Sequence, residues 1–501
     1  MDNEVIMENI ISEFWHVVWH LSSYRYDIAY YVKKLKEIPH QRVIIYSVND
    51  SEFLKLLIAC MMTKKEIYVI NNRVSELDAT QILLNYHAKT ALLSSSKDTL
   101  VNLGIEYLMP IYEVYPGEDN ITEIMDKPNV NNSFNIHFFD ENLRENVFSR
   151  EDIEKIYSEL NRTLVGSFGF STNNARYFLA LKNRSDYFIY ELFSLIHNKK
   201  PLFYDVRTSN KKPKSPSNVK KENILFIEYG ILLEKWNFLV TESFQLNFIF
   251  RAFLNKYMKK VVKKLLAHKL KFKGFNKIII LGIPSNSLLI DILSDWKKVK
   301  VYNIFGENNR LMFTNFSDKI GEVCLASNEE VHVANESKLR YITRQKNLLF
   351  AKLLVSHPSI ENHFLISESY FMQTTANEEK NYAKYCGYKF PKTNSFPHNV
   401  ESLITELPFI KDCLLIRVHD MNVLVYDLNV DILDSTHKNL TTIRKGLLKY
   451  VYYLNNTILK GIIQVDAMRL IPEDCKVYNR FGFLNRQLLY ELEDWDKKLR
   501  L

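Results

Sequence analysis

Glycine is scarce in this sequence, which has 13 glycines among 501 residues. That is less than half of the roughly 7% that is usual in proteins. Loops that bind phosphate depend on glycine, because backbone N–H groups must reach the anion without an intervening Cβ atom. The chain therefore has few places where such a loop could form.

Cysteine pairs and long apolar runs are also missing. Five cysteines are scattered without a C-x-x-C pair, which indicates neither a disulfide framework nor a zinc site. No apolar run approaches the roughly 20 residues of a membrane helix. Asp2, Glu4 and Glu8 make the N-terminus unlike a secretory signal. We expect a globular protein of the reduced cytoplasm.

Several signatures of function are absent. The sequence has no G-x-S-x-G, H-E-x-x-H or Walker motif and no Cys–His pair at a recognised spacing. His16 and His20 lie one helical turn apart but lack an evident third ligand, so we predict no metal site. The net charge of +8 arises from 66 basic and 58 acidic residues, a balance too even to indicate nucleic-acid binding.

What is present is the pattern of a large α/β protein. The length allows two or three domains, and 47% apolar residues can fill their cores. Residues 43–46, 66–70 and 90–94 read as buried strands, with helices expected after Asn49 and over 75–86. This alternation predicts parallel strands joined by right-handed crossovers.

The stretch 271–309 repeats this pattern and carries the candidate site. It predicts a strand over 277–281, a turn with Gly282 and Pro284, a helix over about 287–296, a strand over 299–304 and a Phe305-Gly306 turn. Ligands of open α/β sheets bind beyond the carboxyl ends of the strands. We therefore expect Gly282, Pro284, Phe305 and Gly306 to line a nucleotide or acyl pocket.

This order of elements resembles that of the adenylate-forming ligases, the superfamily of acyl-CoA synthetases, peptide-synthetase adenylation domains and luciferases. Gly387, Pro397, Glu401 and Asp412 match a second motif of that superfamily. The resemblance implies a large N-terminal multi-sheet α/β domain, expected at 1–380, and a small C-terminal α+β lid domain, expected at 384–501.

The resemblance also places a phosphate-binding loop in the segment 163–181. Aligned on Ser171 and Thr172, the segment keeps two hydroxyls and has Arg176 where the superfamily has lysine. Phe170 and Asn173 stand at glycine positions. Two interpretations remain: Ser171, Thr172 and Arg176 contact an anion, or the segment is a structural hairpin or turn.

Other superfamily residues are replaced. Phe483 stands where the resemblance implies a catalytic lysine, and Asn309 stands where it implies a glutamate that organises a metal ion. In the resembling enzymes a carboxylate attacks the α-phosphate of ATP and pyrophosphate leaves. Charge builds on the phosphate oxygens, so the site needs a cation and preorganised donors. We expect weak or no adenylation.

Two functions follow. The first is a homologue that binds an acyl acid or nucleotide, with little ligase activity, as a binding protein or partner-enzyme subunit. The second is an active but divergent acid–thiol ligase, which forms an acyl-AMP intermediate with CoA or a carrier protein as acceptor. ATP and Mg²⁺ are the cofactors implied if the chain is active.

A basic helix is expected over 256–273, with an apolar seam at Met258, Val262, Leu265 and Leu266. Its lysines form either an exposed face that keeps the protein in solution or a contact with an anionic membrane or a CoA phosphate. A membrane-surface protein is thus a third class of function, and salt-sensitive vesicle binding would identify it.

Overall fold

The structure is a computed structural model. It describes residues 22–46, 53–70, 81–82, 84–87, 90–93, 107–110, 135–139, 145–161, 164–165, 170, 174–182, 187–198, 200–206, 221–244, 248–249, 252, 255–270, 272, 274–282, 286–296, 299–305, 315–317, 322–325, 331–333, 343–345, 348–356, 364–377, 380–388, 390, 396–418, 420–429, 440–460, 463–471, 475, 477–478 and 483–491. The sequence also predicts an apolar helix over 4–21, and this segment lies outside these residues, as do Pro284, Gly306, Asn309, Ser171 and Thr172.

The first sheet is parallel except at one edge, in the order β4-β3-β1-β2-β5-β6. β6 runs antiparallel to β5. The parallel strands predicted from the sequence are confirmed, because β1 pairs in parallel with both β2 and β3. The strands are β1 (Arg42–Tyr46), β2 (Glu66–Ile70), β3 (Thr90–Leu93), β4 (Tyr107–Pro110), β5 (Asn135–Phe139) and β6 (Glu145–Ser149).

The second sheet has the order β12-β11-β10-β9-β7-β8 and is parallel except for β12. Its strands are β7 (Ala175–Ala180), β8 (Leu202–Phe203), β9 (Glu222–Glu228), β10 (Lys277–Leu281), β11 (Lys300–Phe305) and β12 (Asn315–Ser317). β10 has the predicted bounds. The segment 163–181, interpreted as an anion contact or as a structural hairpin or turn, ends in β7, which pairs in parallel with β8 and β9.

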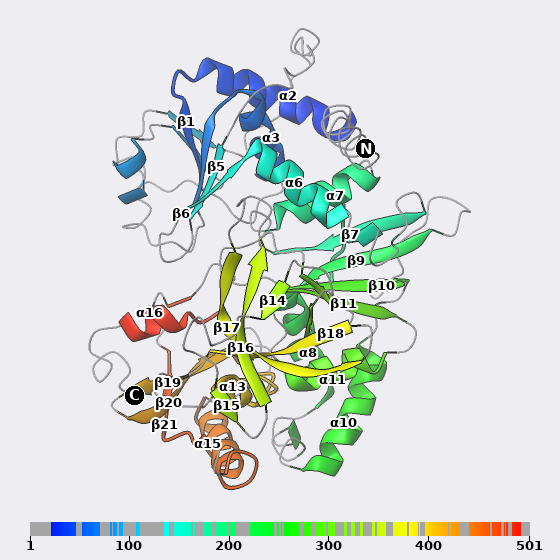
Figure 1. Cartoon of the computed structure of the whole chain (residues 1–501), viewed down its shortest axis with the longest axis vertical. Coiled ribbons are helices and arrows are strands. Elements are labelled where there is room, and N and C mark those ends of the chain that lie inside the picture. The colour runs from blue at the N-terminus through cyan, green and yellow to red at the C-terminus, as the bar shows by residue number, and fades with distance from the viewer. Residues whose placement is uncertain are drawn as a thin grey trace.

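Side chains of the second sheet alternate between two cores, as the period of a strand requires. On β9, Ile224 and Phe226 join a core shared with the first sheet, whereas Leu225 and Ile227 join a core on the opposite face. Helices from both sheets fill the first core: α2 (Ser22–Glu37), α3 (Phe53–Met62), α6 (Arg150–Asn161) and α7 (Phe188–Asn198). Figure 1 shows α6 and α7 between the two sheets.

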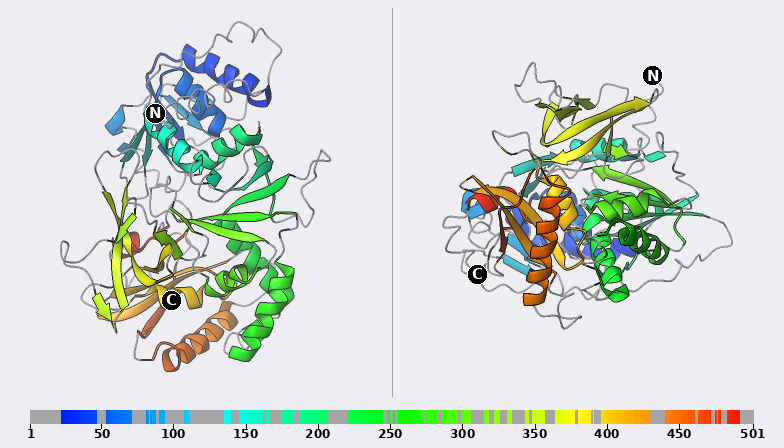
Figure 2. Two further views of the ribbon diagram at one scale, coloured as in Figure 1. Left: turned by 45° about the vertical axis from the view of Figure 1, so that its right-hand side comes forward. Right: turned by 90° about the horizontal axis from the view of Figure 1, so that it is seen from below.

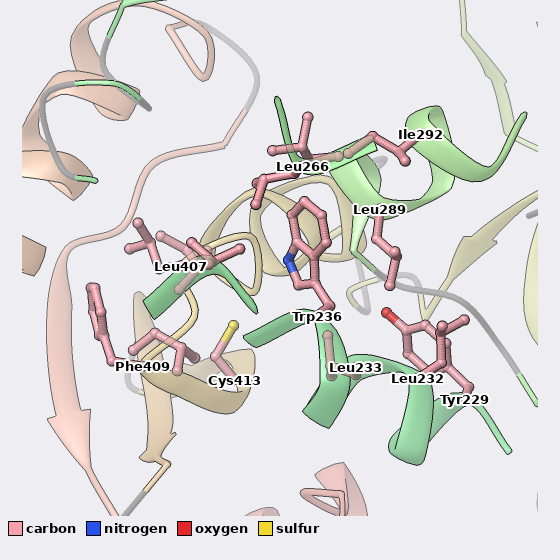
Figure 3. Packing of buried hydrophobic residues seen from close by; sticks show 14 of the residues in the cluster. Tyr229, Leu232, Leu233, Trp236, Leu266, Leu289, Ile292, Leu407, Phe409 and Cys413 are labelled. Atoms are coloured by element: carbon pink, nitrogen blue, oxygen red, sulfur yellow. The ribbon is translucent and has the colours of Figure 1, made fainter. Parts of the chain in front are cut away.

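The second core brings the middle of the chain onto its C-terminal part. We call the first two sheets and their helices the large body. The helices of the large body in this core are α8 (Tyr229–Ser243), α10 (Lys256–Lys269) and α11 (Ser287–Ser294). Figure 3 shows Trp236 of α8 among Leu266, Leu289 and Leu407, which come from three other segments. Trp236 is fully buried. Side chains from α8 to the segment after Leu407 therefore bury their apolar surface in one shared core, and this burial stabilises the contact between these parts of the chain.

The third sheet is antiparallel, and most of it was not predicted. The sequence predicts short strands here over 330–334 and 339–343. Only β14 (Val331–Val333) falls within one of them, while β15 (Thr343–Gln345) begins where the other was expected to end. The remaining strands are β13 (Glu322–Leu325), β16 (Leu348–Ser356), β17 (Phe364–Asn377) and β18 (Lys380–Gly387). β18 runs through the proposed domain boundary and pairs with β13 and β17. The boundary between a domain at 1–380 and one at 384–501 stays a proposal.

The C-terminal part is an α+β unit, as predicted. It has a three-stranded sheet in the order β19-β20-β21 and the long helix α15, which lies beside α10 at the lower end of the molecule in Figures 1 and 2. Its elements are α13 (His398–Ile404), β19 (Ile410–Val418), β20 (Met421–Leu428), α15 (Leu440–Asn456), β21 (Ala467–Leu470) and α16 (Arg486–Glu491).

The apolar seam predicted for the basic helix needs one correction. Val262 and Leu266 are buried and Met258 packs against the same core, but Leu265 is 51% exposed. Residues 258, 262 and 266 follow the four-residue spacing of one helix face, whereas residue 265 lies about 100° away around the helix. Leu265 belongs with Tyr257 and Val261 instead.

Trp236 provides a test of the shared core. We expect Trp236→Ala to lower the free energy of unfolding by about 3–5 kcal/mol, because it removes a large side chain and leaves a cavity. Phe238→Ala is the matched control, since Phe238 lies on the same helix but is 56% exposed. It should change the free energy by less than about 0.5 kcal/mol. Urea denaturation followed by circular dichroism measures both, and equal losses would contradict the assignment.

Candidate functional site

Three adjacent parallel strands end at one edge of the second sheet. β9 is followed directly by Tyr229, β10 by Gly282, and β11 ends at Phe305. Phe305 was expected in a turn, but it is the last residue of β11 and pairs with Asn315 of β12. We call the described residues at this edge, together with the side chains that contact them, the strand-end site.

The backbone conformation at position 282 requires glycine. Its φ angle is +104°, which residues with a Cβ atom rarely adopt. Its N–H donates to the Ile304 carbonyl at 3.1 Å, and its own carbonyl accepts from Asn303 Nδ2 at 2.9 Å. A Cβ atom at Gly282 would lie 3.6 Å from the Tyr187 hydroxyl and 3.7 Å from Tyr229 Cβ. Aromatic side chains of the protein itself thus lie over this turn.

Asn286 joins the strand-end site to the C-terminal unit. It is the N-cap of α11, where its Oδ1 accepts from Leu289 N at 2.9 Å. Its Nδ2 donates to the Thr405 carbonyl at 2.8 Å, and its backbone N–H donates to the Tyr229 hydroxyl at 2.8 Å. Asn286 is fully buried. A buried amide that lost these partners would be costly, so these bonds fix the start of α11 relative to the end of α13.

Phe483 reaches the strand-end site from the C-terminal unit. Its ring stacks on that of Tyr229, with centroids 6.5 Å apart and an interplanar angle of 24°. A Cβ atom at Gly230 would lie 3.7 Å from Phe483 Cζ. At the position where the resemblance implies a lysine, an apolar ring therefore packs against the start of α8.

A buried carboxylate lies beside this ring. Glu228 is the last residue of β9 and is 3% exposed. Its Oε2 accepts from the backbone N–H of Lys182 at 2.8 Å, while its Oε1 lies 3.7 Å from where a Cβ atom of Gly230 would be. The Lys182 ammonium pairs instead with Glu234 at 2.9 Å. Glu228 was not predicted from the sequence, because a glutamate at the end of a strand looks the same whether or not its carboxylate belongs to a site.

Motif residues that the sequence shares with the superfamily hold the segment of Phe483 in place. Asp412 accepts from the backbone N–H of Leu484 at 2.6 Å and from that of Cys413 at 2.8 Å. Arg486 forms a buried ion pair with Glu401 and also donates to the Leu415 carbonyl. Breaking a buried pair of this kind typically costs about 3–5 kcal/mol. The matching residues thus serve the structure of the C-terminal unit.

Burial also shifts the titration of Asp412. It raises the pKa of Asp412 to about 7, against the two backbone N–H donors, which lower it. The carboxylates of Glu401 and Asp427 add to the increase in this pKa. Asp412 therefore holds a proton in the folded protein over a pH range in which an exposed aspartate is ionised.

The remaining predicted site residues are not all brought together. Gly282 and Phe305 lie at the carboxyl edge of the second sheet, but Arg176 is the second residue of β7 and pairs with Asn223 at the opposite, amino edge. Five residues of strand separate those two edges, about 16 Å. Pro284, Gly306, Ser171 and Thr172 lie outside the described residues, so their roles stay predictions.

Phe170, at a position where the resemblance implies glycine, is a core residue. Its side chain is 1% exposed and meets Tyr302 edge to face, with centroids 5.4 Å apart. The Lys277 ammonium lies 4.2 Å from the centroid of the Phe170 ring and pairs with Glu222 at 3.0 Å. This phenylalanine fills the core between the sheets, where a glycine would leave a cavity.

Metal ligands do not cluster in the part of the chain that the structure describes: no group of three or more His, Cys, Asp or Glu side chains there could hold an ion. No helix among the described residues is long and apolar enough to cross a membrane.

Comparison with known proteins identifies the fold. No protein-family model and no curated protein matches the sequence. Solved structures do match. The o-succinylbenzoate CoA synthetase MenE from Bacillus subtilis, in complex with the acyl-adenylate OSB-AMP, has a TM-score of 0.60 at 11% identity, over 96% of this chain and 93% of that one.

Two further structures agree. ATP-bound MatB from Rhodopseudomonas palustris has a TM-score of 0.57 at 12% identity, over 93% of this chain and 92% of that one. The amide bond synthetase McbA from Marinactinospora thermotolerans has a TM-score of 0.58 at 9% identity, with 93% of each chain covered. The chain thus has the fold of the adenylate-forming ligases, and the fold predicted from the sequence is confirmed.

Asp412 provides a test by pH. The unfolded carboxyl ionises near pH 3.8, whereas the folded one keeps its proton up to about pH 7. Between these values the folded state binds more protons, so this group makes the free energy of unfolding fall as pH rises. Relative to Asp412→Asn, wild type should lose up to about 1.4 kcal/mol per pH unit in this window.

Urea denaturation at a series of pH values measures this difference. Asp420→Asn is the matched control, because the Asp420 side chain is 95% exposed in the β19–β20 turn. The control should follow the wild-type curve. Parallel curves for wild type and Asp412→Asn would show that Asp412 is ionised in the folded protein.

Proposed function

We propose that this protein is an adenylate-forming-ligase homologue that binds an acyl acid or a nucleotide and is weak or inactive in ATP-dependent adenylation of a carboxylate. The observation that carries the proposal is the position of Phe483, whose ring stacks on Tyr229 and contacts the Gly230 backbone region. The protein would act as a binding protein or as a subunit of a partner enzyme.

The physical reason lies in how adenylation is catalysed. Charge that develops on phosphate oxygens is stabilised by donors and cations that are already in place. Loss of one such donor costs other enzymes about a hundred- to a thousandfold in rate. A phenyl ring donates no hydrogen bond and carries no charge. It also holds the Tyr229 side of the site apolar, where an ammonium group would otherwise meet the α-phosphate.

The described groups also fit a magnesium triphosphate poorly. Beside Gly282 the strand-end site presents the Tyr187 hydroxyl and Tyr229 Cβ, and beside Gly230 it presents the Phe483 ring and the carboxylate of Glu228. Glu228 is nearly fully buried and already accepts the Lys182 backbone N–H. The stacked rings of Tyr229 and Phe483 suit a flat ring or an acyl chain better than a chain of phosphates.

A second function is supported by the fold neighbours. Structures named above are of ATP-bound and acyl-adenylate-bound ligases, and the match covers more than nine-tenths of this chain. An active, divergent acid–thiol ligase with ATP, Mg²⁺ and CoA or a carrier protein would have the same fold. Its cationic groups would come from other positions, and the sequence offers Arg176 in the phosphate-loop segment and Lys389 or Lys476 as a substitute for the missing lysine.

ATP–pyrophosphate exchange separates these functions. We expect exchange with a panel of fatty, aryl and amino acids to stay at the level of a heat-denatured sample, because Phe483 supplies no cation and the Lys182 ammonium is paired with Glu234. Equilibrium dialysis of AMP, ATP and the same acids should still detect binding of at least one of them.

Exchange clearly above the denatured sample would contradict the proposal. The active-ligase alternative then requires that Arg176→Ala abolishes exchange while Arg469→Ala, at an exposed position on β21, leaves it intact. Absence of both exchange and binding would contradict the two functions together.

A further inference from the structure

Helix α10 has an inner face that is used by the fold. Val262 and Leu266 are buried in the second core. Lys259 forms an ion pair with the buried carboxylate of Glu406 at 2.6 Å, and Lys263 pairs with Asp295 at 2.9 Å. Lys259 and Lys263 thus pair with acidic groups of neighbouring segments. The other lysines of the helix determine whether its outer face is basic.

The outer face of α10 carries two parallel rows. Tyr257, Val261 and Leu265 form an apolar row at four-residue spacing and are 81%, 56% and 51% exposed. Lys260, Lys264 and His268 are also exposed and form a second row at the same four-residue spacing. Lys260 and Lys264 directly precede Val261 and Leu265 in the sequence. The helix contains no Asp or Glu. Large apolar side chains in a regular exposed row mark an interaction surface more often than isolated ones do.

Helix α15 repeats this arrangement. Leu448 and Tyr452 are 56% and 73% exposed at four-residue spacing. Lys445 and Lys449 lie beside them, and both are exposed. Ile458, 52% exposed, follows the end of the helix together with the exposed Lys460. α15 also contains no Asp or Glu.

The two helices lie side by side at the end of the molecule farthest from α2, as the views of Figures 1 and 2 agree. The same short segment anchors both of them. Lys259 of α10 pairs with Glu406, and the Tyr450 hydroxyl of α15 donates to the Leu403 carbonyl at 3.4 Å. We call the outer faces of α10 and α15 the basic–apolar end.

We propose that the basic–apolar end binds the surface of a bilayer that contains anionic phospholipids. Lysines attract acidic headgroups, each contributing on the order of 1 kcal/mol near such a surface. Tyrosine and aliphatic side chains between the lysines can enter the boundary between headgroups and acyl chains, as they do in interfacial amphipathic helices. Among the described residues, Asp291 and Asp295 lie on this side, and Lys263 pairs with both of them at 3.6 and 2.9 Å.

A bilayer explains two features that a single acidic protein partner does not require. The same combination of exposed Tyr, aliphatic and Lys side chains occurs on two separate helices, and both helices lie at the same end of the molecule. A laterally extended anionic surface contacts both at once and needs no shaped groove. This proposal is independent of whether the chain adenylates a carboxylate.

Vesicle co-sedimentation of the full chain tests the proposal. We expect binding to vesicles of phosphatidylcholine with added phosphatidylserine but not to vesicles of phosphatidylcholine alone, and we expect high salt to release the protein. The variants Lys260→Glu/Lys264→Glu and Tyr257→Ser/Val261→Ser should each bind at least about tenfold more weakly.

Lys33→Glu/Lys36→Glu on α2 is the matched control. It makes the same change in charge at exposed positions near the other end of the molecule, and it should bind within about twofold of wild type. The proposal is overturned if wild type does not bind the phosphatidylserine vesicles at low salt, or if the α2 control loses as much binding as the α10 variants. Binding to polyglutamate but not to vesicles would overturn it as well and assign an acidic protein partner.

Discussion

The apolar core around Trp236 is the constraint on which the rest of the structure depends. It takes side chains from α8, α10 and α11 of the large body and from Leu407, Phe409 and Cys413 of the C-terminal unit. Two polar contacts with buried groups cross the same boundary, Asn286 to Thr405 and Lys259 to the buried Glu406. Apolar burial supplies most of the stabilisation, whereas the polar contacts fix one arrangement, because a shift would leave buried groups without partners.

This arrangement decides what the strand-end site contains. Because Asp412 and Arg486 hold the segment 483–486 within the C-terminal unit, docking of that unit brings Phe483 onto Tyr229. Phe170 fills the other core in the same way. At both positions the resemblance implies residues that handle phosphate, and at both the structure has a packed aromatic ring. The interactions that stabilise the fold thus lie where catalysis would need flexible or charged groups.

Most of the fold could be predicted from local patterns, and much of the site could not. Runs such as Lys277–Leu281 and Glu66–Ile70 were found with their observed bounds, since strands buried on both faces read as continuous apolar runs. The antiparallel strands β16, β17 and β18 were missed, because partners distant in sequence decide their pairing and only Gly387, at the end of β18, matched a motif. Glu228, Tyr229 and Asn286 acquire their roles through tertiary contacts alone. Only the position of Asn286 before an apolar helix could have indicated its capping role.

The central claim is that the C-terminal unit is locked onto the large body with Phe483 at the strand ends. Native-state hydrogen exchange of the Leu484 amide, which donates to Asp412, tests it most directly. The account predicts that this amide and those of α15 exchange only through global unfolding, with the same free energy of opening as the amides of β10. Exchange of Leu484 and α15 at a much lower free energy, while β10 stays protected, would show that the unit detaches on its own and would contradict the account.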